Sequence, residues 1–151
     1  MTARVTVRPA GKADIPTMVG LLRQLFAIED EFAFDPATQA RGLSLLLDQP
    51  RAAAFVAERD GIAIGMATAQ LLVSTARGGP VATIEDVIID KAFRGSGAGR
   101  LLIEAAEAWA RGHGCLRLQL LADRENPPAL DFYDRIGFGR TRMVWLVRQL
   151  G

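Results

Sequence analysis

The segment that most constrains the fold is the run of residues 87–102, which reads VIIDKAFRGSGAGRLL. It predicts a strand, then a loop that carries the pattern Arg-x-x-Gly-x-Gly, then the start of an amphipathic helix. Gly95, Gly97 and Gly99 allow the loop backbone to turn tightly and to approach a ligand closely. The following helix directs its unpaired N–H groups and the positive end of its dipole at the same place. This arrangement predicts an anion site, most often one for phosphate.

The loop pattern is not specific by itself in a chain with 15 glycines, because a flexible surface turn can match it by chance. The flanking strand and helix, with Arg94 and Arg100 at the two ends of the loop, favour a binding loop. Two other phosphate motifs fit less well. The dinucleotide-binding pattern that begins at Gly95 has Arg100 at its third glycine position, and the segment lacks the Gly-Lys-Ser/Thr of a P-loop.

Length and composition predict one globular domain over residues 1–151, with 50% hydrophobic residues for its core. A net charge of +1 gives no sign of a nucleic-acid-binding surface. Cys115 is the only cysteine, which excludes an internal disulfide and fits a reducing compartment. The sequence shows no apolar signal segment and no apolar stretch long enough to span a bilayer. We therefore expect a cytoplasmic protein with no membrane or nucleic-acid partner.

The spacing of apolar residues predicts the element order βααβββαβαβ, which is a mixed α/β, α+β-like single domain. The expected strands are Arg4–Arg8, Ala54–Glu58, Ile62–Val73, Val81–Ile89, Leu116–Leu121 and Thr141–Gln149. The expected helices begin after Asp14, at Pro36, near Ala98 and at Asn126. The near-continuous apolar run Leu116–Leu121 is typical of a strand covered on both faces.

The glycine loop resembles the acetyl-CoA-binding motif of the GNAT superfamily of N-acyltransferases. The resemblance extends along the chain to the strand Ile-Glu-Asp-Val-Ile-Ile-Asp at 84–90, to Asn126, to Phe132-Tyr133 and to Gly137-Phe138. It implies a GNAT-type domain with a central, mostly antiparallel sheet, splayed strands and about four flanking helices. The opening Val-Arg-Pro-Ala, the Ile-Glu-Asp strand and the interval from Asn126 to Tyr133 resemble the diamine (spermidine/spermine-type) acetyltransferase branch.

The resemblance implies that acetyl-CoA is the co-substrate and that no metal takes part. The loop backbone would hold the coenzyme A pyrophosphate through Arg94, Gly95, Ser96, Gly97, Ala98, Gly99 and Arg100. Along the preceding strand, Val87, Ile88 and Ile89 would bind the pantetheine arm. The N–H groups of Val87 and Ile89 face one edge of that strand and would pair with the arm as a further strand would. Asn126 would contact the cofactor across the gap between the splayed strands, and it equally suits a helix cap before Pro127.

Transfer of an acetyl group to an amine requires the unprotonated amine, which is about one part in 2,500 at pH 7 for a pKa of ~10.4. By resemblance, Glu85 is the candidate base or water-positioning residue, helped by burial or by a bridging water. The alternative is a solvated strand residue that pairs with an arginine. Asp86 is expected to face the other side of the strand and to have a structural role.

The resemblance makes Tyr133 the candidate acid for the departing thiolate, and the same side chain is expected to contact the cofactor. The alternative is an amphipathic core residue with a satisfied hydroxyl group. The N–H group of Val87 would stabilise the developing oxyanion.

Glu29, Asp30, Glu31 and Asp35 cluster between the first two helices, a region that forms one wall of the acceptor site in the superfamily. Glu29 lies where the diamine branch has an acidic residue, so Glu29 and Glu85 are the predicted acceptor-binding residues. A carboxylate cluster suits a second ammonium, as in a polyamine, whereas Phe32 and Phe34 also suit arylalkylamines. The alternative for the cluster is a solvated helix end.

These residues predict an acetyl-CoA-dependent N-acyltransferase that moves an acetyl group directly to a primary amine of a small molecule, with a polyamine as one candidate. Three alternatives stay open: an acyl-CoA-binding sensor without transfer, N-acetylation of a protein or peptide amine, and a nucleotide-binding module of another fold. The final expected strand could support a homodimer, which the sequence does not decide.

Overall fold

The computed structural model describes residues 3–151. They form two compact units, a first that ends at Leu120 and a second, Leu121–Gly151. The first unit contains a five-stranded sheet with the order β1-β2-β3-β4-β5. Its strands are β1 Thr6–Pro9, β2 Ala52–Arg59, β3 Ile62–Ser74, β4 Gly79–Ile89 and β5 Leu118–Leu120. All neighbouring strands are antiparallel except β4 and β5, which are parallel, so the predicted mixed α/β fold with a mostly antiparallel sheet is confirmed.

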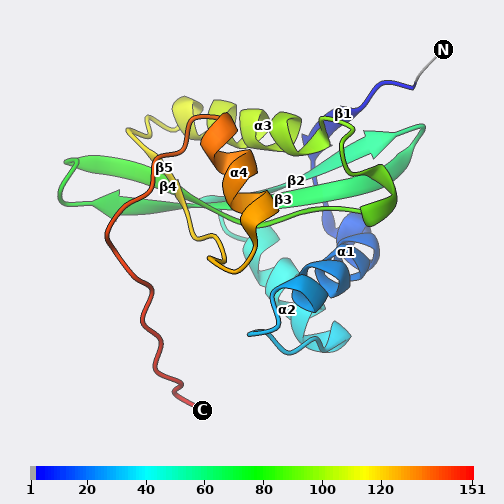
Figure 1. The fold of residues 1–151 in the computed structure, drawn as a ribbon, viewed down its shortest axis with the longest axis horizontal. Coiled ribbons are helices and arrows are strands. Elements are labelled where there is room, and N and C mark those ends of the chain that lie inside the picture. Colours follow the sequence, from blue (N-terminus) through cyan, green and yellow to red (C-terminus); the bar gives the residue numbers. More distant parts are fainter. Residues whose placement is uncertain (1–2) are drawn as a thin grey trace. The chain divides into compact units, whose positions relative to one another are not determined.

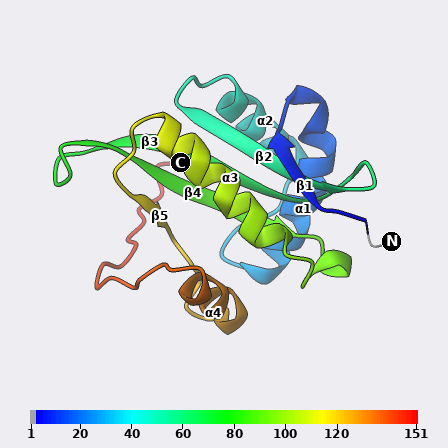
Figure 2. The ribbon, with the colours of Figure 1, turned by 90° about the horizontal axis from the view of Figure 1, so that it is seen from above.

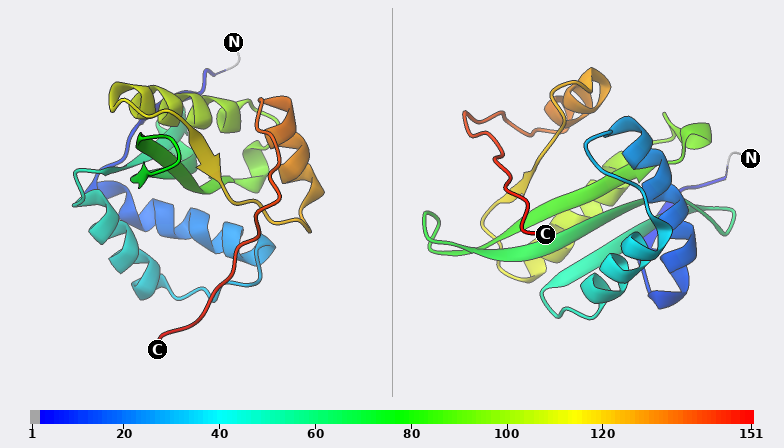
Figure 3. Two further views of the ribbon diagram at one scale, coloured as in Figure 1. Left: turned by 90° about the vertical axis from the view of Figure 1, so that its left-hand side faces the viewer. Right: turned by 90° about the horizontal axis from the view of Figure 1, so that it is seen from below.

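Helices cover both faces of this sheet (Figures 1 and 3). The helices of the first unit are α1 Ile15–Ile28, α2 Pro36–Leu47 and α3 Ala98–Gly112. The left view of Figure 3 shows α3 on one face and the pair α1 and α2 on the other, and Figure 2 shows α3 crossing the strands. Each helix begins where the sequence predicts, because Pro16 lies in the first turn of α1 and Asp35 caps α2.

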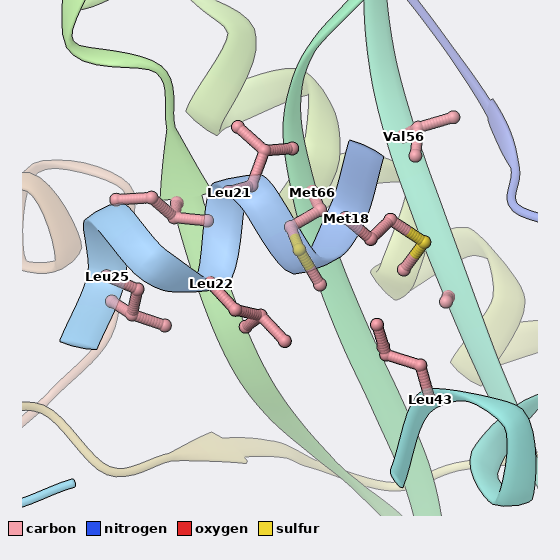
Figure 4. Packing of buried hydrophobic residues seen from close by; sticks show 9 residues of the cluster. Met18, Leu21, Leu22, Leu25, Leu43, Val56 and Met66 are labelled. Carbon is pink, nitrogen blue, oxygen red and sulfur yellow. The ribbon is translucent and has the colours of Figure 1, made fainter. Parts of the chain in front are cut away.

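One core cluster lies between the sheet and the pair α1 and α2 (Figure 4). Helix α1 supplies side chains at the spacing i, i+3, i+4 and i+7, which places them on one face. The labelled members of the cluster are Met18, Leu21, Leu22, Leu25, Leu43, Val56 and Met66, each less than a tenth exposed. At about 1.5–3 kcal/mol for each buried side chain, this face fixes α1 and α2 on the sheet.

Strand β4 contains a bulge in its second half. Its register with β3 shifts between the pairs Thr68↔Glu85 and Met66↔Ile88, so that Ala67 faces both Asp86 and Val87. Asp86 adopts a left-handed backbone conformation with φ 55°. A bulge of this kind inserts one extra residue and reverses the alternation of the strand beyond it. The direction of every group after Asp86 therefore differs from that of a regular strand.

The second unit contains one short helix, α4 Pro127–Arg135, which the sequence predicts from Asn126 onward. The predicted strand Thr141–Gln149 is wrong, because the described residues after 138 form neither helix nor strand. Apolar side chains in this segment are exposed, among them Met143 at 85% and Leu146 at 86%. Its composition is that of a strand, but a strand also needs a neighbour for its backbone hydrogen bonds, and local composition does not specify one.

Two further expectations on strands need correction. The run Leu116–Leu121 is not a strand covered on both faces: β5 has only three residues, and Leu116 and Leu121 are 53% and 57% exposed. Strand β1 extends past Arg8, since the N–H group of Ala10 still donates to the carbonyl of Ala54 at 2.8 Å. Among the described residues, no helix is long and apolar enough to cross a membrane.

Candidate functional site

The second half of β4 has an open edge. Pairing with β5 covers Ala82–Ile84, and within the first unit no strand pairs with β4 beyond that point on this side. The N–H group of Asp90 donates to the carbonyl of Ile64 on β3 at 2.7 Å. By alternation, the N–H groups of Val87 and Ile89 point away from β3, toward the edge that β5 leaves. These amides therefore have the direction expected of a splayed strand.

Ile88 has fewer groups available to bind a ligand than Val87 and Ile89 have. Its side chain is 6% exposed in the core under α1 and α2, and its carbonyl oxygen lies close to Gly65 of β3. Both its side chain and its backbone therefore face the interior or β3. A cofactor-binding role for Ile88 stays a prediction. Ile88 lies between Val87 and Ile89, whose N–H groups point to the open edge.

The glycine loop forms an open turn at the N-terminus of α3. Gly95 and Gly97 adopt φ 80° and 84°, and a Cβ built on either meets nothing within 4 Å. Gly97 is the N-cap and supplies no side-chain cap, and the first intrahelical hydrogen bond runs from the N–H of Leu101 to its carbonyl at 3.3 Å. The N–H groups of 98–100 thus precede the helical ladder. The N–H group of Ala98 donates to the hydroxyl group of Ser96 at 3.4 Å. Open space, N–H groups that precede the helical ladder and the helix dipole suit a diphosphate.

Glu85 and Asp86 form an acidic pair at the bulge. Glu85 lies opposite Thr68, and the hydroxyl group of Thr68 donates to the Asp86 carboxylate at 3.0 Å. Both carboxylates therefore lie on the face of the sheet that carries Thr68. Desolvation raises the pKa of Glu85, and the charge of Asp86 raises it further. Burial raises the pKa of Asp86, partly offset by the hydrogen bond from Thr68.

The expectation that Asp86 faces away from Glu85 is wrong, because the bulge turns it to the same face. Asp86 lines a cavity of about 300 Å³ between α1 and α2, together with Leu22, Phe26, Thr38, Gln39, Gly42, Leu43 and Leu46. Reasoning from alternation misses this residue. The one signal in the sequence is that two adjacent carboxylates interrupt an otherwise apolar strand.

The acidic residues between α1 and α2 have different roles. Glu29 follows α1 directly, is partly buried, and its N–H group donates to the carbonyl of Leu25 at 2.8 Å. Asp35 caps α2 by accepting from the N–H and hydroxyl groups of Thr38, at 3.1 and 2.6 Å, and these bonds lower its pKa. Asp35 is therefore structural. An acceptor-binding role for Glu29 stays a prediction.

An aromatic group accompanies these acids. The rings of Phe32 and Phe34 lie 5.4 and 6.5 Å from that of Phe26, and the guanidinium of Arg23 lies 4.9 Å from the centre of the Phe34 ring. Phe26 lines the cavity that contains Asp86. The cavity wall at the end of α1 is therefore aromatic and held by neighbouring rings.

The other two predicted site residues lie in the second unit, which is described by itself. The side chain of Asn126 accepts from the N–H group of Ala129 at 3.4 Å, so its role as a helix cap is confirmed. Tyr133 lies on α4, partly buried, with its ring 5.2 Å from Phe132 and 5.7 Å from Phe138. Their roles toward the cofactor and the thiolate stay predictions.

Comparison of the sequence with known proteins gives a consistent answer. Residues 21–138 match the model of the acetyltransferase (GNAT) family. An aminoglycoside N(6')-acetyltransferase type 1 of Salmonella enteritidis is 28% identical over 95% of this chain and 97% of that protein. An uncharacterized N-acetyltransferase of Methanocaldococcus jannaschii is also 28% identical, but the chain spans only 64% of that relative's length. Neither relative is named as a diamine acetyltransferase, so the expected likeness to the diamine branch is not supported.

Solved structures agree with the sequences. The aminoglycoside N-acetyltransferase AAC(6')-Iy, bound to the bisubstrate analogue CoA-S-monomethyl-acetylneamine, superimposes with a TM-score of 0.83 at 25% identity, covering 97% of this chain and 98% of that one. The family match and the CoA-bound structural neighbour agree on the co-substrate. The chain belongs to the acetyltransferase (GNAT) family and is an N-acetyltransferase that uses acetyl-CoA.

Proposed function

We propose that the protein acetylates a primary amine of a small molecule that carries more than one ammonium, as aminoglycosides do. The observation that carries this proposal is the acidic pair Glu85 and Asp86, which directly precedes the open edge of β4. Two adjacent carboxylates attract a multiply charged cation better than a singly charged one. The matched aminoglycoside N(6')-acetyltransferase supports the same acceptor class. Both units together, residues 1–151, would form the single N-acetyltransferase domain.

The cofactor would be held at two places. Its diphosphate would accept hydrogen bonds from the backbone of residues 94–100, where Gly97 leaves the N-terminus of α3 open. Its pantetheine arm would lie along β4 and use the amides of Val87 and Ile89. When bound, acetyl-CoA supplies an acyl thioester; the chain supplies positioning of both reactants, the largest part of the rate enhancement.

Proton transfer would fall to two side chains and one backbone amide. Deprotonation of an amine with pKa ~10.4 costs about 4.6 kcal/mol at pH 7. Glu85 would accept this proton, directly or through a water, and its raised pKa makes it a better base than an ordinary glutamate. The N–H group of Val87 would stabilise the negative charge on the carbonyl oxygen. Tyr133 would donate its hydroxyl proton to the departing thiolate.

A thiol-release screen tests this proposal. The purified protein and acetyl-CoA are mixed with neamine, polyamines, arylalkylamines, amino acids and peptide N-termini, and the acetylated product is identified by mass spectrometry. We expect turnover with amines that carry two or more ammonium groups, neamine included. Binding of acetyl-CoA without thiol release across the whole panel would instead identify an acyl-CoA sensor. Turnover confined to peptide N-termini would identify a protein or peptide acetyltransferase.

A further inference from the structure

The carboxylate of Asp86 is partly buried and has few partners. It accepts from the hydroxyl group of Thr68 at 3.0 Å, and the same hydroxyl also lies 3.2 Å from the carbonyl oxygen of Glu85. A hydroxyl has one proton, so it serves one acceptor at a time. Within residues 3–151, no arginine or lysine forms an ion pair with Asp86. Partial burial of a carboxylate without a cation is unfavourable, and a bound cation would relieve this.

The cavity in front of Asp86 determines what kind of cation fits. Its volume is about 300 Å³, and Leu22 and Phe26 of α1 face Leu43 and Leu46 of α2 across it. Two polar groups of α2 that line it take part in the helix cap: the Thr38 hydroxyl donates to Asp35 at 2.6 Å, and the side-chain oxygen of Gln39 accepts from the Asp35 N–H at 2.7 Å. One carboxylate between hydrocarbon walls suits an ammonium carried by a hydrocarbon arm.

We propose that Asp86 and this cavity bind the second, non-reacting ammonium of the acceptor, while Glu85 faces the amine that is acetylated. The carbon chain that carries the second ammonium packs against Leu22, Phe26 and Leu43. This inference rests on the proposed function and refines it, because it assigns different ammonium groups to the two carboxylates. Asp86 is then a specificity-determining residue: it decides which amines bind, not how fast a bound amine reacts.

Gly42 provides a way to fill the cavity without disturbing the protein. It lines the cavity on α2, and a Cβ built on it meets nothing within 4 Å. A leucine at this position would extend into space that the acceptor would otherwise occupy. Gly20 is the matched control, because it is an exposed helical glycine on α1 with the same open surroundings and does not line the cavity. Both replacements gain the same helix propensity.

The test compares 1,5-diaminopentane with pentylamine, which share a carbon chain and differ in the second ammonium. Steady-state thiol release gives KM and kcat, and calorimetry of each amine on the free protein gives Kd without turnover. We expect Asp86→Asn and Gly42→Leu each to raise KM and Kd for the diamine about tenfold. Pentylamine values should change by less than about twofold for Asp86→Asn. Gly20→Leu should leave KM and Kd unchanged for both amines. Asparagine is chosen at residue 86 because it tolerates the left-handed backbone conformation found there.

Two results would overturn the inference. The first is an unchanged ratio of diamine to pentylamine Kd in Asp86→Asn, and the second is full diamine affinity in Gly42→Leu. Failure of the proposed function looks different, because wild-type protein would then release no thiol with any amine of the panel. Calorimetry with 1,5-diaminopentane would still decide the role of Asp86 in that case.

Discussion

The two halves of β4 differ in what surrounds them. From Ala82 to Ile84 the strand pairs with β3 and with β5, and the hydroxyl group of Thr83 accepts from the side chain of Gln119 at 3.1 Å. From Glu85 onward it pairs with β3 alone, bulges at Asp86 and leaves one edge open. The first half stabilises the sheet. The second half has backbone N–H groups on its open edge and two adjacent carboxylates, and it is the half where we propose that the ligands bind.

Two aspartates, Asp14 and Asp86, differ in the same way. Asp14 accepts two hydrogen bonds from the guanidinium of Arg8, at 2.7 and 2.9 Å, and one from the N–H of Gly11 at 2.8 Å, which lower its pKa to about 2. Asp86 has the hydroxyl group of Thr68 as its side-chain donor, and burial raises its pKa. The chain itself compensates the charge of Asp14, whereas Asp86 has no such ion pair within the described residues.

The largest expected effect is a loss of kcat when the second half of β4 is changed, with no such loss in the first half. Glu85→Gln removes the proposed base, so we expect kcat to fall about 10²–10⁴-fold while the free energy of unfolding changes little. Thr83→Val is the matched control in the paired half: losing its hydrogen bond with Gln119 should lower the free energy of unfolding by about 1 kcal/mol and leave kcat unchanged. Thiol release and urea unfolding of both variants measure this. A kcat within about twofold of wild type in Glu85→Gln would remove it from the chemistry.

An intermediate effect is expected at the glycine loop. Gly97 and Gly78 both have positive φ, 84° and 71°, and in both an added Cβ meets nothing within 4 Å. Alanine at either position should therefore lower stability by about 1 kcal/mol. Only Gly97→Ala should weaken acetyl-CoA binding, by about tenfold, since Gly78 lies in the turn between β3 and β4. Calorimetry with acetyl-CoA checks this, and equal affinity in the two variants would contradict a role for the loop.

The smallest expected effect is on stability, and its sign differs between the two aspartates. A raised pKa in the folded state means that ionised Asp86 destabilises the fold above that pKa, and that the penalty disappears as the pH falls. Asp86→Asn should therefore stabilise the protein by about 1 kcal/mol near pH 7 and less at acid pH. Asp14→Asn should do the opposite, because the stability that Asp14 contributes is present above 3.8 and lost as the pH falls to about 2.

Urea unfolding of both variants at neutral and acid pH measures these differences. Asp14→Asn should be less stable than wild type by about 1–2 kcal/mol at neutral pH, and its difference from wild type should shrink on acidification. A loss of stability in Asp86→Asn near pH 7 would mean that the chain already compensates this carboxylate. Asp86 would then belong with Asp14 as a structural residue.

Features set by nearby residues could be predicted from the sequence. The spacing of Met18, Leu21, Leu22 and Leu25 gives the buried face of α1, and the glycines before α3 give the open N-terminus. The cap at Asn126 follows from its place before two prolines. The helix face, the open N-terminus and the cap each depend on a few neighbouring positions, so they can be predicted from the local sequence.

Features set by distant pairing could not. The bulge at Asp86 exists because of the register of β4 against β3, which alternation along one strand does not reveal. Pairing with a distant strand also decides the length of β5 and the structure of the segment after residue 138. The apolar composition of these segments does not show which strand they would pair with.

Amide hydrogen exchange resolved by NMR tests the central claim most directly, namely that the open edge of β4 holds the cofactor. The amides of Val87 and Ile89 should exchange fast in the free protein and be slowed when acetyl-CoA is bound. The amide of Ala82, which donates to the carbonyl of Arg117 at 3.0 Å, should be slow in both states. Unchanged exchange at Val87 and Ile89 under saturating acetyl-CoA would contradict the account, since the arm would then lie elsewhere.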